Sequence, residues 1–213
     1  LPHARPALVQ RAVPVPFDVM ELHRLCHLVD TAVAQLGGLD LLVNNAGGSM
    51  PKALLDTSIR SFERALTFNV TTAFELTKQA VPAMLERGGG SVVNISSAAG
   101  RVPDRGFAAY GTAKAALTHL TRETACDLSP RVRVNAIAVG SVATSALEMV
   151  LTDESTRTAM EQSTQLRRLG EPEDIAAGVL YLCSPAGSYL TGKVLEIDGG
   201  MLTPPLGLGL PDL

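Results

Sequence analysis

Residues 39–47 read Leu-Asp-Leu-Leu-Val-Asn-Asn-Ala-Gly, an apolar run that stops at two asparagines and a glycine. A short apolar run followed by turn-forming residues is typical of a strand that is buried on both faces. Ahead of it, apolar residues between 22 and 36 recur at steps of three and four, which predicts an amphipathic helix that ends at Gly37-Gly38. A helix that leads into a fully buried strand is typical of α/β proteins.

The same alternation continues to residue 200. Further helices are predicted over 58–86, where Pro82 should kink or shorten the helix, and over 107–128 and 171–183. Further strands are predicted over 91–95, 132–138 and 194–197. We therefore predict one Rossmann-like domain over 1–213, a doubly wound α/β fold with a parallel sheet and an irregular tail at 203–213. Such sheets bind ligands beyond the carboxyl ends of their strands.

Composition excludes several classes of protein. With 46% apolar and 18% charged residues, the 213-residue chain is expected to be globular and not disordered. The 18 basic and 21 acidic residues give a net charge of −3, which argues against a nucleic-acid partner. The sequence has no apolar run long enough to span a membrane, and residues 1–10 lack the apolar core of a signal peptide. Three cysteines without a CxxC spacing indicate a reduced, cytoplasmic protein.

Three residues carry the clearest chemical signal. Tyr110 and Lys114 lie four residues apart on one predicted helix and share a face. A free tyrosine has a pKa of about 10, and a nearby cation lowers that value. A shift of about three units needs roughly 4 kcal/mol, which a low-dielectric cleft can supply. Ser97 ends a predicted strand and could hydrogen-bond a substrate oxygen, so the set suits proton transfer to or from an alcohol or carbonyl. The plainer alternative is a half-buried aromatic ring beside a solvated lysine.

Together with other segments in the same order, these residues resemble the short-chain dehydrogenase/reductase family. The resemblance covers residues 18–200 and includes Asp18-Val19, Asn44-Asn45-Ala46-Gly47, Asn69-Val70, Asn94-Ile95-Ser96-Ser97, Tyr110-Gly111-Thr112-Ala113-Lys114, Arg133-Val134-Asn135, Gly140 with Thr144, Arg168-Leu169-Gly170, and Thr191-Gly192 with Asp198-Gly199-Gly200.

The resemblance implies an oxidoreductase that interconverts an alcohol and a ketone or aldehyde with NAD or NADP. Tyr110 would be the general acid or base, and Lys114 would lower its pKa and hold the nicotinamide ribose. Ser97 would polarise the substrate carbonyl, and Asn69 would hold a water in a proton relay. The implied cofactor-binding set is Asp18, Val19, Asn44, Ala46, Gly47, Val70, Tyr110, Lys114, Gly140, Val142 and Thr144. A homodimer or homotetramer packed through helices 58–86 and 107–128 is also implied.

Several of these residues have plainer interpretations. Asp18 could cap the helix that follows it. Asn69 could face solvent or bond its own backbone, and Asn44 could be a turn residue. His23 and His27 share a helix face, but the sequence shows no third ligand near them, so no metal site is predicted.

The sequence departs from the family pattern in two places. Val139 stands where the family usually has a proline before Gly140, which loosens the turn there. No glycine-rich phosphate loop is found, and roughly the first two strands with their helices are expected to be missing. Either the chain belongs to a longer, complete dehydrogenase, or the short chain is the real product and should be weakly stable with little cofactor binding.

Two rival functions follow from the same residues. A truncated, non-catalytic pseudoenzyme could serve as a subunit or scaffold, and an epimerase or dehydratase could use the same tyrosine and lysine. The polar stretch 141–165 could form a lid over a substrate. Apolar residues at 146–151 hint at an apolar portion of that substrate or at helix packing.

Overall fold

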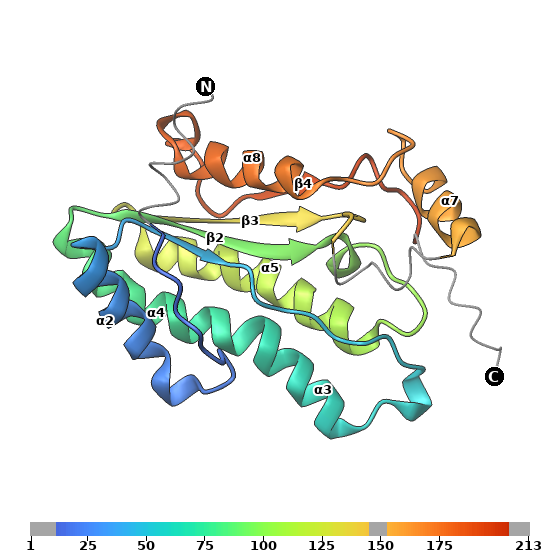
Figure 1. The fold of residues 1–213 in the computed structure, drawn as a ribbon, viewed down its shortest axis with the longest axis horizontal. Coiled ribbons are helices and arrows are strands. Elements are labelled where there is room, and N and C mark those ends of the chain that lie inside the picture. The colour runs from blue at the N-terminus through green and yellow to red at the C-terminus, as the bar shows by residue number, and fades with distance from the viewer. Residues whose placement is uncertain (1–11, 145–152, 205–213) are drawn as a thin grey trace.

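A computed structural model of the chain describes residues 12–144 and 153–204. Its centre is a four-stranded sheet in which all neighbours run parallel, in the order β1 (Leu41–Asn44), β2 (Gly90–Ser97), β3 (Val132–Val139) and β4 (Val194–Ile197). Parallel strands need crossover connections, and helices supply them here. Figure 1 shows the strands aligned in one direction, so their carboxyl ends meet at one edge.

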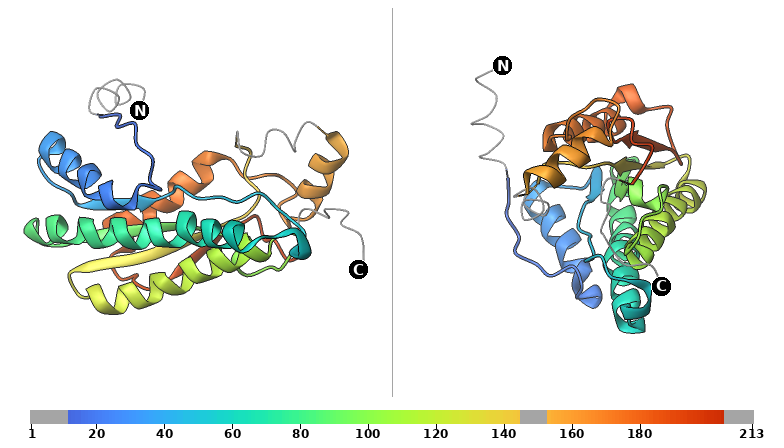
Figure 2. Two further views of the ribbon diagram at one scale, coloured as in Figure 1. Left: turned by 90° about the horizontal axis from the view of Figure 1, so that it is seen from below. Right: turned by 90° about the vertical axis from the view of Figure 1, so that its right-hand side faces the viewer.

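Helices cover both faces of the sheet. The helices are α2 (Leu25–Leu36), α3 (Ile59–Leu66), α4 (Thr72–Glu86), α5 (Ala108–Leu128), α7 (Glu154–Gln162) and α8 (Pro172–Cys183). Helices α4 and α5 contact β1, β2 and β3 on one face, and α8 contacts β2, β3 and β4 on the other. In Figure 1 the sheet lies between these two layers, and the end-on view of Figure 2 shows the same division. The predicted doubly wound α/β fold is confirmed.

The core follows from the alternation of side chains along β2. Val92 packs with Ala80 and Met84 of α4, and α2 adds Val29 to the same cluster. The next residue, Val93, packs on the opposite face with Leu182 of α8. Because both faces are covered, consecutive residues are buried, and this explains why the strand reads as a continuous apolar run.

The predicted helix ends are formed by local hydrogen bonds. Gly37 follows α2 with φ +81°, and its N–H donates to the Val33 carbonyl at 2.9 Å. A glycine adopts this left-handed conformation without a steric penalty. Ser58 caps α3 by accepting from the Ser61 N–H at 3.2 Å, and Glu171 begins α8 with a capping box.

The predicted helix 58–86 is irregular at a different place from the one expected. Pro82 lies inside α4, which continues to Glu86, so the proline does not end it. The irregular segment is instead η3 (Thr67–Thr71), a π-helical turn between α3 and α4. Such turns often occur at functional sites, and this one contains Asn69.

The resemblance implies a strand that ends at Asp18, but the described residues 12–18 form no strand. Asp18 accepts the Met20 N–H with its carboxylate at 2.9 Å and the Glu21 N–H with its carbonyl at 3.0 Å. These bonds form a turn ahead of the 3-10 helix η1 (Leu22–Arg24). This arrangement resembles the alternative interpretation, in which Asp18 caps the helix that follows it. Two prolines at 14 and 16 offer no N–H to a neighbouring strand, and no described strand lies beside this segment.

Part of the predicted lid and most of the predicted tail, 145–152 and 205–213, lie outside the described residues. The remainder of the lid contains α7. Among the described helices, none combines the length and the apolar character that crossing a bilayer requires.

Candidate active site

Ser97 and the helix that carries Tyr110 meet at the carboxyl end of β2. Ser97 is the last residue of β2, and its hydroxyl accepts the Ala99 N–H at 3.2 Å, which begins the 3-10 turn η4 (Ala98–Gly100). Helix α5 packs against β2, β3 and η4. This packing brings the side chains of Ser97 and Tyr110 into hydrogen-bond contact.

Lys114 lies one turn further along α5. Its Nζ is 5.7 Å from the centroid of the Tyr110 ring, and Phe107 packs edge-on against that ring at 6.1 Å between centroids. The three residues selected from the sequence are thus brought together, from a strand end and one helix face. An oxygen atom placed near the Tyr110 hydroxyl could also reach the Ser97 hydroxyl, as proton transfer to a carbonyl requires.

Burial shifts the pKa values of both Tyr110 and Lys114. Burial raises the pKa of Tyr110 above its ordinary value, and the hydrogen bond with Ser97 opposes that rise. Burial also lowers the pKa of Lys114 to about 8. The sequence predicted a lowered tyrosine pKa, so the structure differs in direction. The reason is that a dry environment disfavours both the phenolate and the ammonium.

Lys114 has donor capacity that the described residues do not use. Its Nζ donates to the Ile95 carbonyl at 2.9 Å, and the residue is only 4% exposed. An ammonium has three donors, and the described residues provide this one hydrogen bond. A buried ammonium with donors to spare fits a ligand that brings oxygen atoms, such as ribose hydroxyls.

Asn69 fastens the loop after β1 to the π-helical turn. Its Nδ2 donates to the Ala65 carbonyl at 2.8 Å and to the Gly48 carbonyl at 3.0 Å, and its Oδ1 accepts the Gly48 N–H at 2.9 Å. The side chain therefore bonds its own helix, as one interpretation of the sequence expected, and also positions the neighbouring loop.

Gly47 lies where a side chain would not fit. A Cβ built on Gly47 would be 2.6 Å from Asn69 Oδ1 and 3.0 Å from Lys114 Nζ. This proximity places the loop after β1, the π-helical turn and α5 around one point. Ala46 precedes it as an exposed residue, and Val70 follows Asn69 in η3.

We predict that Gly47→Ala lowers kcat/KM by about 10- to 100-fold, because a displacement of about 1 Å at a reacting group can cost about 100-fold. The added methyl must displace Asn69 or Lys114. Steady-state kinetics measures the loss, and Ser49→Ala, an exposed change in the same loop, is the matched control. An unchanged kcat/KM in the Gly47 variant would show that the close approach has no catalytic role.

The loop after β3 is held by two neighbouring segments. The Gly140 N–H donates to the Ile197 carbonyl at 3.0 Å, and a Cβ at Gly140 would be 2.6 Å from the Asp198 Cα. Val142 forms a parallel bridge with Gly170. The Arg168-Leu169-Gly170 segment thus supports this loop, and Thr144 follows as an exposed residue. Val139 simply ends β3.

The side chain of Asn44 points into the core, and its predicted contact with the cofactor stays a prediction. Its Nδ2 donates to Asn94 Oδ1 at 2.8 Å and to Thr77 Oγ1 at 3.1 Å, and Asn94 in turn donates to Thr121 Oγ1 at 2.9 Å. This buried network joins β1, β2, α4 and α5 beneath the site. This role of Asn94 was not predicted, although a polar residue inside the apolar run 92–95 was a signal for it.

A doubly wound parallel sheet with a polar cluster at the carboxyl ends of its strands defines a nucleotide-binding type of α/β enzyme. The family model described as enoyl-(acyl carrier protein) reductase matches residues 4–202. The chain is 58% identical over 205 residues to an uncharacterized oxidoreductase of Mycobacterium tuberculosis, a match that covers 96% of this chain and 78% of that protein. It is 42% identical over 184 residues to the 7alpha-hydroxysteroid dehydrogenase of Escherichia coli K12, which covers 86% and 71% of the two chains. The chain therefore belongs to the short-chain dehydrogenase/reductase family.

Solved structures agree with this assignment. A 7alpha-hydroxysteroid dehydrogenase in complex with NADH and 7-oxo glycochenodeoxycholic acid superposes with a TM-score of 0.83 at 41% identity, over 88% of this chain and 73% of that chain. A short-chain dehydrogenase/reductase from Mycobacterium ulcerans gives a TM-score of 0.83 at 34% identity, over 87% and 68%. The predicted lack of a glycine-rich loop stays a prediction.

Proposed function

We propose that the chain interconverts an alcohol and a ketone or aldehyde with NAD or NADP, using Tyr110 as the general acid or base. The observation that carries the proposal is the hydrogen-bond contact of Tyr110 with Ser97, with the buried amine of Lys114 beside the Tyr110 ring. When bound, the nicotinamide supplies or accepts the hydride. The residues of the chain bind the substrate oxygen and move its proton.

In the reducing direction, the substrate oxygen accepts hydrogen bonds from the hydroxyls of Ser97 and Tyr110. Negative charge develops on that oxygen, and Tyr110 donates its proton to it. The raised pKa of Tyr110 keeps the proton on the free protein at neutral pH. The phenolate left behind is stabilised by the Lys114 ammonium, which is charged below pH 8. Oxidation of the alcohol uses the same groups in reverse.

The residues present fit the nicotinamide half of the cofactor. Gly47 leaves room beside Asn69 and Lys114, and Lys114 has donors for ribose hydroxyls. The loop around Gly140, Val142 and Thr144 lies beyond the end of β3, where ligands bind in such sheets. We propose cofactor contacts also for Asp18, Val19, Ala46 and Val70. The support for these four is the family pattern.

Thermal unfolding of the chain, alone and with saturating NADH or NADPH, tests the proposal. A cofactor at about 100 times its Kd stabilises a native site by roughly 2.7 kcal/mol, which raises Tm by a few degrees. We expect one of the two to raise Tm and thereby to identify the preferred cofactor. A Tm that neither NADH nor NADPH changes would contradict the proposal and favour a non-catalytic subunit or scaffold.

Turnover is tested with a carbonyl probe, and 7-oxo glycochenodeoxycholic acid is the first choice because a relative at 41% identity binds it. We expect oxidation of the reduced cofactor in proportion to the alcohol formed. Cofactor that returns unchanged while the substrate is converted would instead indicate an epimerase or dehydratase.

We further propose that the protein acts in the cytoplasm as a homodimer or homotetramer packed through α3, α4 and α5. Phe74 and Leu85 of α4 are 45% and 40% exposed, and Ile59 at the start of α3 is 77% exposed. Apolar side chains on one set of helices favour contact with a second copy. Light scattering of the purified chain would measure the mass, and a monomer at all concentrations would contradict this part.

A further inference from the structure

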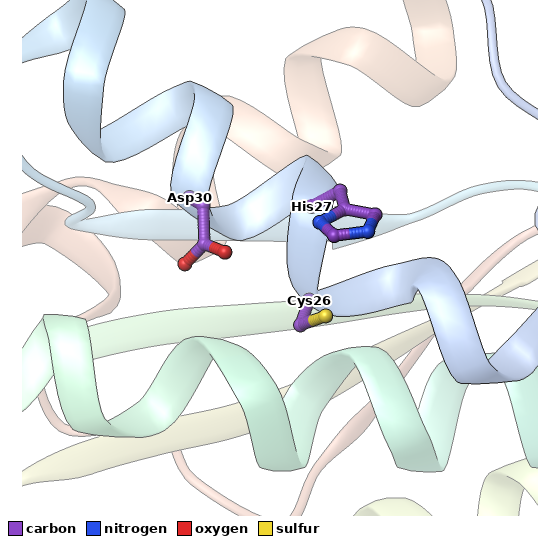
Figure 3. A group of neighbouring side chains, drawn as sticks. All are labelled: Cys26, His27 and Asp30. Carbon is purple, nitrogen blue, oxygen red and sulfur yellow. The ribbon is translucent and has the colours of Figure 1, made fainter.

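Outside the candidate active site, three side chains with metal-binding atoms gather on α2. They are Cys26, His27 and Asp30, and one ligand atom from each lies within 4.8 Å of the other two. Figure 3 shows the sulfur, the imidazole ring and the carboxylate as the corners of a triangle beside the helix. From the sequence, His23 and His27 share a helix face and no metal site is predicted, whereas the structure groups His27 with a thiol and a carboxylate.

Helix geometry explains why these three residues meet. Cys26 and Asp30 are four residues apart and His27 and Asp30 are three apart, so both pairs are neighbours on the helix surface. Leu25 and Val29, at 0% and 9% exposure, anchor the helix, and Val29 packs in the core cluster that includes α4. The backbone is therefore fixed while the ligand atoms face outward.

The three side chains are available for a ligand. His27 and Asp30 are exposed and Cys26 is partly exposed. In the described part of the chain, none of their side-chain atoms takes part in a hydrogen bond or ion pair; the bond at this turn, from Thr31 Oγ1, uses the His27 carbonyl. By contrast, His119 lies 3.1 Å from a carboxylate oxygen of Glu123.

We propose that Cys26, His27 and Asp30 bind a divalent transition-metal ion, with Zn²⁺ as the favoured ion. Ligands on one tetrahedral Zn²⁺ lie about 2.0–2.3 Å from it and hence roughly 3.3–3.8 Å from one another. The present spacing requires the side chains to close by about 1 Å, which rotation about exposed side-chain bonds provides. The thiol releases its proton to solvent as the metal–sulfur bond forms.

The donor set selects the class of ion. A thiolate and an imidazole suit Zn²⁺ and neighbouring transition metals, whereas Mg²⁺ and Ca²⁺ require oxygen ligands. Three protein ligands leave a fourth position for water or an external donor. Because the ligands span one turn, bound metal also braces the start of α2, where Arg24 offers no side-chain cap. This proposal is independent of the proposed oxidoreductase activity.

Titration of the reduced, metal-free chain with Zn²⁺ against a chromophoric chelator tests the site. We expect one equivalent to bind, and Co²⁺ in its place to give a thiolate-to-metal charge-transfer band with the visible bands of a tetrahedral ion. Cys26→Ser and Asp30→Asn should each weaken Zn²⁺ binding at least tenfold, and Cys26→Ser should also abolish the charge-transfer band.

Cys126→Ser and His119→Asn are matched controls, because they remove an exposed cysteine and an exposed histidine from α5. Both should bind Zn²⁺ as the parent chain does. Circular dichroism would verify that every variant keeps the helical content of the parent. The proposal is overturned by a chain that binds no stoichiometric Zn²⁺, by unchanged binding in Cys26→Ser and Asp30→Asn, or by binding that depends on Cys126 instead.

Discussion

Tyr110→Phe is expected to lower kcat/KM by about 10³-fold while leaving the protein folded. General acid–base catalysis contributes about 10²- to 10⁴-fold, and this substitution removes the hydroxyl that is proposed to exchange a proton with the substrate oxygen. The phenyl ring is retained, so its edge-on packing against Phe107 is kept. Steady-state kinetics in the reducing direction measures the loss, and thermal unfolding verifies the fold.

Tyr189→Phe is the matched control for this prediction. Tyr189 is fully exposed, so removal of its hydroxyl should change neither kcat/KM nor Tm. Cofactor binding provides a second readout, because Tyr110→Phe should retain most of the Tm shift given by NADH or NADPH. Turnover that survives in Tyr110→Phe would remove the proposed role of Tyr110, even if the cofactor still binds.

Most of the fold could be predicted from the sequence because its central strands, β2 and β3, are buried on both faces. The run at 39–43 was also expected to be buried, but β1 is an edge strand in which Leu41 and Val43 are 49% and 41% exposed. The apolar runs at 91–95 and 132–138 lie within β2 and β3, and 194–197 coincides with β4. Helix ends at Gly37 and at Glu171 also follow from local chemistry, since a glycine conformation and a capping box act within a few residues. Patterns of this kind need no knowledge of distant contacts.

The remaining features depend on contacts that a sequence pattern does not contain. The strand expected before Asp18 needs a neighbouring strand, and the described sheet places none there. The π-helical turn carries Asn69, whose side chain hydrogen-bonds Gly48, twenty-one residues away. The pKa of Tyr110 was predicted from the charge of Lys114 alone, but burial acts on both groups and reverses the direction.

The second large effect concerns Lys114, whose buried charge is expected to lower stability. The fall of its pKa from 10.5 to about 8 corresponds to roughly 3 kcal/mol against the charged form in the folded state. The unfolded chain binds a proton between pH 8 and 10.5 that the folded chain does not, so stability should rise with pH across that window. Below pH 8 the full cost is present.

Lys114→Met should therefore raise the free energy of unfolding at pH 7 by about 2 kcal/mol. This estimate subtracts about 1 kcal/mol for the lost hydrogen bond to the Ile95 carbonyl. The gain should shrink as pH rises through 8 and become a loss of about 1 kcal/mol above 10.5, where Lys114 is neutral in both states and only the lost hydrogen bond counts. Urea denaturation across this pH range measures it. Lys78→Met, which alters an exposed lysine of α4, should show no such pH dependence.

The same substitution should lower kcat/KM by about 10²-fold or more, since the cation that stabilises the Tyr110 phenolate is lost. In the parent chain, kcat/KM for reduction should decline above pH 8 as Lys114 loses its proton, and Lys114→Met should remove that decline. A variant that is less stable at pH 7, or that keeps full activity, would contradict this account. A chain that gains stability and loses turnover together would show that Lys114 is retained for catalysis at a cost to the fold.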